Sequence, residues 1–176
     1  DTFHEYVPLD WLERIWRVML STSHHTYIIL TKRGDRLPVA VPQIMHRICG
    51  PHWAPPSHIH LGVSISTQPD ADREIPHLLA TPAAVRFVSV EPMLGPVDLF
   101  CYLPNTGWRE SPECLGLDWV IVGCESGPNR RPMELDWARV VVQQCKAVGI
   151  PVFIKQLSID GRVSHDPAEW PEDLRV

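Results

Sequence analysis

The chain has 176 residues, of which 44% are apolar, so it can bury one hydrophobic core and gives no reason to expect two domains. It has neither an apolar stretch of about twenty residues nor a secretory leader pattern, so we expect no membrane association and a cytoplasmic location. The formal net charge of −5 excludes a long electrostatic track along a nucleic-acid duplex, whereas a nucleotide or another small anion is compatible with it.

The first predicted element is an amphipathic helix over Leu9 to Leu20, preceded by a start signal at Pro8. Its apolar residues recur at the spacing of one helix face, and they are Leu12, Ile15, Trp16 and Met19.

Five later segments are short, strongly apolar and rich in β-branched residues, which predicts strands buried on both faces. They are Thr26 to Thr31, Ile59 to Ile65, Val85 to Val90, Trp119 to Val122, and Pro151 to Ile154. The strand starts lie about thirty residues apart, the length of one βα unit, so we expect parallel strands joined by crossovers.

The connections between these strands differ in character. Ile75 to Ala80 is a short and weak helix candidate, Gly95 to Gly116 is a long irregular excursion, and Trp137 to Val148 is a clear amphipathic helix that ends at Gly149. The polar segment from Ser158, with two Pro and one Gly, is expected to be a loosely held tail.

Polar or charged side chains end every predicted strand, as expected for the mouth of a β/α barrel, where many strands contribute to one site. We therefore predict an α/β protein with a partial, five-unit TIM-like barrel of parallel strands over residues 1–157 and a polar tail over 158–176. An open doubly wound sheet is the alternative. A barrel of this kind closes with about eight strands, so a missing N-terminal segment or a homo-oligomer would have to close it.

Two carboxylates, Glu91 and Glu125, follow adjacent predicted strands. They could act as acid and base, hold a cation, or bind an amino group. The alternative is that each glutamate pairs with Lys32 or Lys155 and only neutralises the barrel mouth.

The loop from Gly123 to Arg131 joins a buried strand to the clear helix. It contains two glycines and one proline, and it ends in Arg130 and Arg131. Backbone N–H groups of such a loop can approach an anion, and the arginines can bind phosphate or carboxylate. An ordinary strand-to-helix turn with solvated arginines fits the same residues.

Metal-competent side chains crowd the stretch between the first two strands, namely His46, Cys49, His52, His58 and His60. Their spacing matches no familiar zinc pattern and the nearby prolines indicate a loop, so we predict no metal site. The five cysteines are odd in number and widely spaced, which is typical of reduced intracellular thiols.

Several strings occur together in an order that resembles the phage-associated three-Cys-motif family, a group of barrel proteins of unassigned function. They are Phe3-His4-Glu5, Leu30-Thr31-Lys32-Arg33, Leu61-Gly62-Val63-Ser64, Phe87-Val88-Ser89-Val90-Glu91-Pro92, Val122-Gly123-Cys124-Glu125-Ser126-Gly127 and Phe153-Ile154-Lys155-Gln156. The chain departs from this family at Ser66 and Thr67, where relatives usually carry glutamate and asparagine, and at Cys124, where glycine is common.

The resemblance implies a radical-SAM-like barrel whose upstream three-cysteine motif would bind an iron–sulfur cluster, and this chain begins after that motif. None of its cysteines reproduces the motif's close spacing, so no cluster is expected here. The resemblance transfers nine mouth residues as substrate or cofactor contacts: Lys32, Arg33, Ser64, Glu91, Glu125, Ser126, Arg131, Lys155 and Gln156.

The resulting hypothesis is a phage- or prophage-type protein that forms the C-terminal portion of such a barrel, with S-adenosylmethionine as its candidate cofactor and no catalysis by the chain alone. The first alternative is a module that binds a small anion or nucleotide without catalysis. The second is a non-functional truncated fragment.

Overall fold

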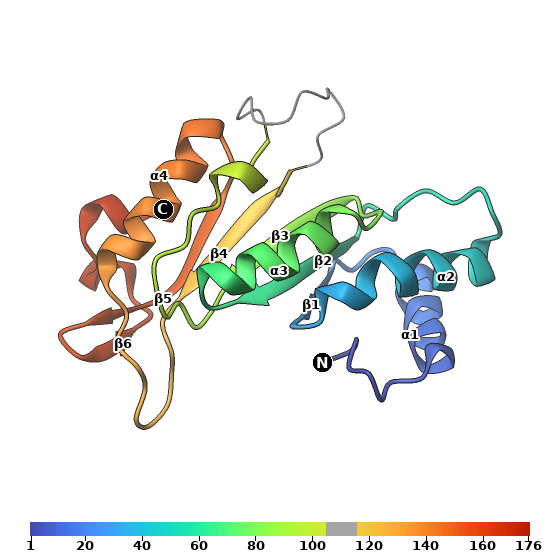
Figure 1. Ribbon diagram of the computed structural model, residues 1–176, viewed down its shortest axis with the longest axis horizontal. Helices are drawn as coiled ribbons and strands as arrows, with labels where there is room; N and C mark the ends of the chain where they lie inside the picture. The colour runs from blue at the N-terminus through green and yellow to red at the C-terminus, as the bar shows by residue number, and fades with distance from the viewer. Residues whose placement is uncertain (105–115) are drawn as a thin grey trace.

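The computed structural model describes residues 1–104 and 116–176 and has a mixed α/β fold built on one six-stranded sheet (Figure 1). The strands follow one another in space in chain order, and the sheet curls into a half-barrel. Five are parallel: β1 (Tyr27–Thr31), β2 (Ile59–Ile65), β3 (Val85–Val90), β4 (Trp119–Gly123) and β5 (Val152–Ile159). The five predicted strands and their parallel arrangement are therefore confirmed.

Four α-helices accompany the sheet, and they are α1 (Leu9–Ser21), α2 (Leu37–Cys49), α3 (Gln68–Leu79) and α4 (Leu135–Val148). The helices α2, α3 and α4 lie in the crossovers after β1, β2 and β4. The predicted helices at the positions of α1 and α4 are confirmed, and Gly149 ends α4 in the left-handed conformation. No described helix is long and apolar enough to cross a membrane.

The two faces of the sheet are unequal. Side chains alternate between faces along a strand, and Val63, Val88 and Val120 lie in register on the outer face, where they are fully buried. The opposite face, here called the inner face, carries Leu30, Gly62, Phe87 and Trp119 in register. On this inner face Leu30 is 40% exposed at the edge strand β1, so the core lies mainly beneath the helices.

Two helical segments differ from the sequence-based expectations. The stretch around His46 and Cys49, expected to be a loop, belongs to α2, where Pro38 stands in the first turn and Pro42 is accommodated inside the helix. The weak candidate at Ile75 to Ala80 is the end of the longer helix α3. Its start is fixed by a capping box between Thr67 and Asp70.

The segment from Ser158, expected to be a loosely held tail, is instead packed against the rest of the chain. The strand β5 continues to Ile159, and β6 (Arg162–Ser164) returns antiparallel to it. The connecting residues Asp160 and Gly161 both have positive φ, as a two-residue hairpin requires. Further on, the 3-10 helices η3 (Pro167–Glu169) and η4 (Glu172–Leu174) precede and follow Trp170, which is 4% exposed.

The excursion predicted between the third and fourth strands is only partly described, because residues 105–115 lie outside the described residues. Its described part contains the 3-10 helix η2 (Phe100–Tyr102) and the buried side chains of Val97 and Leu99. It therefore adds apolar contacts to the core as well as connecting two strands.

Candidate functional site

A cavity of about 360 Å³ lies where the carboxyl ends of the parallel strands meet on the inner face. This volume is within the range of small-molecule sites, about 300–1,000 Å³. Parallel strands direct their carboxyl ends to one edge of a sheet, so residues distant in sequence meet there. The lining residues are Leu30, Lys32, Ser64, Ser89, Glu91, Pro92, Cys124, Glu125 and Ser126. Five of the nine predicted mouth residues are therefore in this lining.

The first carboxylate of the cavity, Glu91, is held by Lys155 from another strand. Lys155 Nζ donates to Glu91 Oε1 at 2.8 Å. The Glu91 side chain lies close over Gly123, since a Cβ built on Gly123 would be 3.2 Å from Glu91 Cγ and Cδ. Ser64 Oγ donates to the backbone carbonyl of Glu91 at 3.1 Å, which fixes the strand end that carries the carboxylate.

The second carboxylate, Glu125, forms a bidentate pair with Arg131 from the same loop. Arg131 donates to Glu125 through Nη2 at 2.5 Å, through Nε at 2.9 Å and through its backbone N–H at 2.7 Å. These hydrogen bonds from Arg131 lower the pKa of Glu125 from its ordinary value of 4.5 to about 2. The Glu125 carboxylate is therefore ionised at neutral pH, and its hydrogen bonds to Arg131 hold it in one position within the loop.

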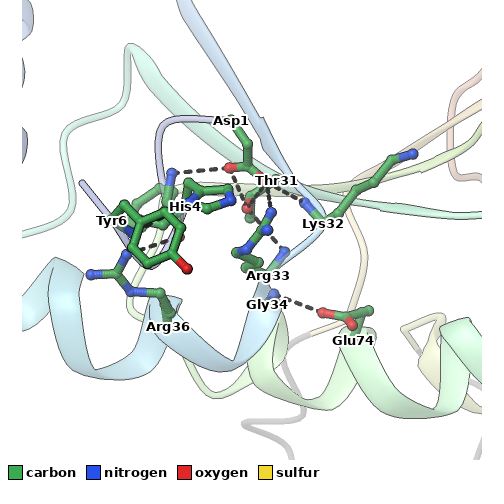
Figure 2. Close-up of polar contacts among 10 residues, drawn as sticks. Asp1, His4, Tyr6, Thr31, Lys32, Arg33, Gly34, Arg36 and Glu74 are labelled. Carbon is green, nitrogen blue, oxygen red and sulfur yellow. Dashed lines mark hydrogen bonds and ion pairs between the residues drawn. The ribbon is translucent and has the colours of Figure 1, made fainter.

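Lys32 is the cavity's basic residue without an internal partner. Its backbone N–H donates to Asp1 Oδ2 at 3.0 Å, and its Nζ forms no ion pair with any residue that the structure describes. Figure 2 shows the Lys32 side chain extending away from the neighbouring cluster around Asp1 and Thr31. An ammonium group in such a position can bind a carboxylate or a phosphate of a ligand.

Arg33 and Gln156 are placed beside the cavity and are absent from its lining. Arg33 Nη1 donates to Asp1 Oδ2 at 3.3 Å, so its charge is directed to the N-terminal segment (Figure 2). Gln156 is buried, and its Nε2 donates to the carbonyl of Cys124 at 2.6 Å. In return, the backbone N–H of Cys124 donates to the Gln156 carbonyl, so Gln156 shapes the loop that carries Glu125.

The alternative interpretation of the carboxylates, in which lysine neutralises them, thus holds for Glu91, whereas Glu125 is paired with an arginine. Sequence reasoning did not find the role of Gly123, because its signal is the close approach of a side chain from a different strand. It also did not find the contacts of Asp1 with the β1 end, which depend on the path of the N-terminal segment.

An iron–sulfur cluster requires several cysteine thiolates close together. Cys49 and Cys101 are exposed, whereas Cys124 and Cys145 are buried, and Cys114 lies outside the described residues. Among the described residues, no group of three or more His, Cys, Asp or Glu side chains could hold a metal ion. The described cysteines therefore do not fit a cluster.

The fold and the cavity define an α/β half-barrel protein with a ligand-sized site at the carboxyl ends of its parallel strands. The family described as "Protein of unknown function (DUF5131)" matches residues 1–166, and the chain belongs to this family. No curated protein and no solved structure matches the chain significantly.

Proposed function

We propose that the chain is the ligand-binding part of a TIM-like, radical-SAM-like β/α barrel in a phage- or prophage-type protein, and that its mouth cavity binds the carboxylate or phosphate group of a small ligand. One observation carries the proposal: the cavity is lined by Lys32, which has no ion-pair partner among the described residues, whereas Glu91 and Glu125 are already neutralised. A lysine ammonium without an intramolecular partner can bind the carboxylate or phosphate of a ligand.

The candidate ligand is S-adenosylmethionine, which carries a carboxylate besides its ammonium and sulfonium groups, and which has ribose hydroxyls. Lys32 would bind the carboxylate, and the hydroxyls of Ser64, Ser89 and Ser126 would supply hydrogen bonds. When bound, this cofactor supplies radical chemistry only together with a reduced cluster, which the described residues do not fit. We therefore expect binding by the isolated chain without turnover.

The inner face supports the view that further strands complete the barrel. Ile28 and Phe153, apolar side chains on strands near opposite ends of the sheet, are 57% and 52% exposed. Since β1 pairs only with β2 in the described sheet, strands from an additional segment or from a second copy would cover this face.

The experiment is the thermal melting shift of the chain with S-adenosylmethionine, with mononucleotides and with inorganic phosphate. A ligand at a hundred times its dissociation constant should stabilise the folded chain by about 2.7 kcal/mol. The matched variants are Lys32→Met and Lys146→Met, because Lys146 is an exposed lysine in the last turn of α4, outside the cavity lining. The proposal expects the shift to become much smaller in the Lys32 variant alone.

The second candidate is an anion or nucleotide binding module without catalysis, and the two ion pairs favour it. An acid–base pair needs a carboxylate free to exchange protons, yet Glu125 is held by Arg131 and Glu91 by Lys155. A shift with nucleotide or phosphate but not with S-adenosylmethionine would support this candidate. The absence of a shift with all three ligands would contradict both and support a non-functional fragment.

A further inference from the structure

A buried carboxylate outside the cavity, that of Glu74, contacts the turn that follows β1. Glu74 lies in α3 and is 5% exposed, surrounded on the helix by the buried apolar residues Ala71, Ile75 and Leu78. Its Oε2 accepts the backbone N–H of Gly34 at 2.7 Å, and its Oε1 accepts Arg73 Nε at 2.7 Å. Burial of a carboxylate is costly unless such bonds compensate it.

The contact between Glu74 and Gly34 is close enough to require glycine. A Cβ on Gly34 would lie 2.8 Å from Glu74 Oε2 and 2.9 Å from the Glu74 carbonyl oxygen. The turn at η1 (Gly34–Arg36) is therefore pressed directly against α3. An apolar side chain at position 74 could pack in the same space, but it could not accept the Gly34 N–H.

The backbone on the other side of Lys32 is held as well. Thr31 Oγ1 accepts the Arg33 N–H at 3.0 Å, and Asp1 Oδ2 accepts the Lys32 N–H at 3.0 Å. Figure 2 shows these contacts together with the bond from Gly34 to Glu74, and it shows the Lys32 side chain pointing away from them. Because no described residue holds Lys32 Nζ, its position depends on how firmly its backbone is fixed.

We infer that Glu74 is a positioning residue for Lys32: by accepting the Gly34 N–H it fixes the turn after β1, and thereby the direction in which Lys32 enters the mouth cavity. This inference rests on the proposed function, since it assigns Lys32 as the anion contact. Glu74 itself does not line the cavity. It acts by reducing the conformational freedom that Lys32 would lose on binding.

The test compares Glu74→Leu and Glu74→Gln, each with Lys32 and with Lys32→Met, by calorimetric titration with S-adenosylmethionine and inorganic phosphate. Leucine removes the acceptor, whereas glutamine keeps an oxygen for Gly34 and supplies a folded variant if leucine is not tolerated. With Lys32 present, Glu74→Leu should weaken binding by about tenfold and Glu74→Gln by less, as expected for one lost hydrogen bond. In the Lys32→Met background, Glu74→Leu should have almost no further effect.

Amide hydrogen exchange at Gly34 gives a readout that does not depend on a ligand. The Gly34 N–H should be protected in the parent chain and in Glu74→Gln, and it should exchange much faster in Glu74→Leu. Equal losses of affinity in both Lys32 backgrounds, or no loss in either, would overturn the positioning role while leaving the anion site intact. If Lys32→Met alone leaves binding unchanged, the proposed function fails first, and the inference fails with it.

Discussion

Lys155 donates to Glu91 at 2.8 Å although the two residues belong to strands that are not neighbours in the sheet. Glu91 follows β3, Lys155 lies on β5, and β4 runs between them. The side chains therefore meet above β4, at Gly123, where the absence of a Cβ leaves room for the Glu91 carboxylate. At the mouth of the half-barrel, the missing Cβ of Gly123 thus allows the Glu91 carboxylate to reach Lys155 across β4.

Gly123→Ala should weaken the pair between Glu91 and Lys155. The new Cβ would lie 3.2 Å from Glu91 Cγ and Cδ, which forces the side chain to shift by a few tenths of an ångström. We expect a loss of about 0.5–1 kcal/mol in the free energy of unfolding, the value of a partly exposed ion pair. Urea denaturation measures it.

The control for this prediction is the same substitution in a Lys155→Met background. Without the ammonium group, the shift of Glu91 no longer breaks a bond, so Gly123→Ala should cost clearly less there. Equal costs in both backgrounds would show that Gly123 is required for the backbone and not for the ion pair. Gly95→Ala serves as a further control, because a Cβ there would meet no atom within 4 Å.

The pKa of Glu125 is the basis of a second prediction. Hydrogen bonds from Arg131 lower it from 4.5 to about 2 in the folded chain. The folded-state pKa lies below the unfolded one, so the stabilising pair is complete above about pH 4.5 and is lost as the pH falls toward 2. Carbon-13 NMR of the side-chain carboxyl should therefore show Glu125 titrating near pH 2.

Arg131→Gln should return the Glu125 titration toward 4.5, whereas Arg130→Gln should leave it low. Arg130 is the matched control because it is the adjacent arginine, and its guanidinium donates to the backbone carbonyls of Gly127 and Gly161. A Glu125 that titrates near 4.5 in the parent chain would mean that the bidentate pair is not maintained in solution.

The strands could be predicted from the sequence because each is a short apolar run. Their starts are too far apart in the sequence for hairpins, so crossover connections were expected. The helix α2 could not, because Pro38 and Pro42 interrupt its pattern while the tertiary fold accommodates both. The hairpin after β5 had a local signal, Asp160-Gly161, which fits a two-residue turn. It was obscured by the polar character of the residues that follow.

The mouth of the half-barrel was predictable for a topological reason, since the ends of parallel strands meet at one edge. The pairing of charges there was not predictable. Lys155 reaches Glu91 across β4, and Arg33 turns to Asp1, because side-chain reach in three dimensions decides such contacts. The role of Gly123 was not predictable for the same reason, because it depends on the approach of the Glu91 side chain from another strand.

The cysteines give a third prediction. Burial raises the pKa of the Cys145 thiol to about 12, and burial also raises the pKa of Cys124. Since the thiolate is the reactive form, Cys49 and Cys101, which are exposed, should react with a thiol reagent at pH 8 well before these two. Mass-spectrometric mapping of a Cys114→Ser chain measures each site.

Denaturant provides the control for the labelling. In unfolding concentrations of urea the four thiols should react at similar rates, because the burial that distinguishes them is removed. Rapid labelling of Cys124 in the folded chain, at a rate close to that of Cys49, would show that the loop beside the cavity opens readily. The loop conformation in which Glu125 pairs with Arg131 would then be one of several that the folded chain adopts.

Phe87 and Gly62 give the last prediction, which concerns the inner face. Phe87 is fully buried, and its ring lies over Gly62 and against Trp119, with ring centroids 4.8 Å apart. A Cβ on Gly62 would lie 2.4 Å from Phe87 Cζ, a separation that cannot persist. Gly62→Ala should therefore cost about 1–3 kcal/mol in the free energy of unfolding, as overpacking does in cores.

A smaller residue at position 87 should relieve this clash. Phe87→Leu alone leaves a gap and destabilises the chain, but in combination with Gly62→Ala the two costs should sum to clearly more than the measured cost of the double variant. Strict additivity would mean that the Phe87 ring does not rest on Gly62 in solution. The packing of the inner face around Gly62 would then have to be assigned to other residues.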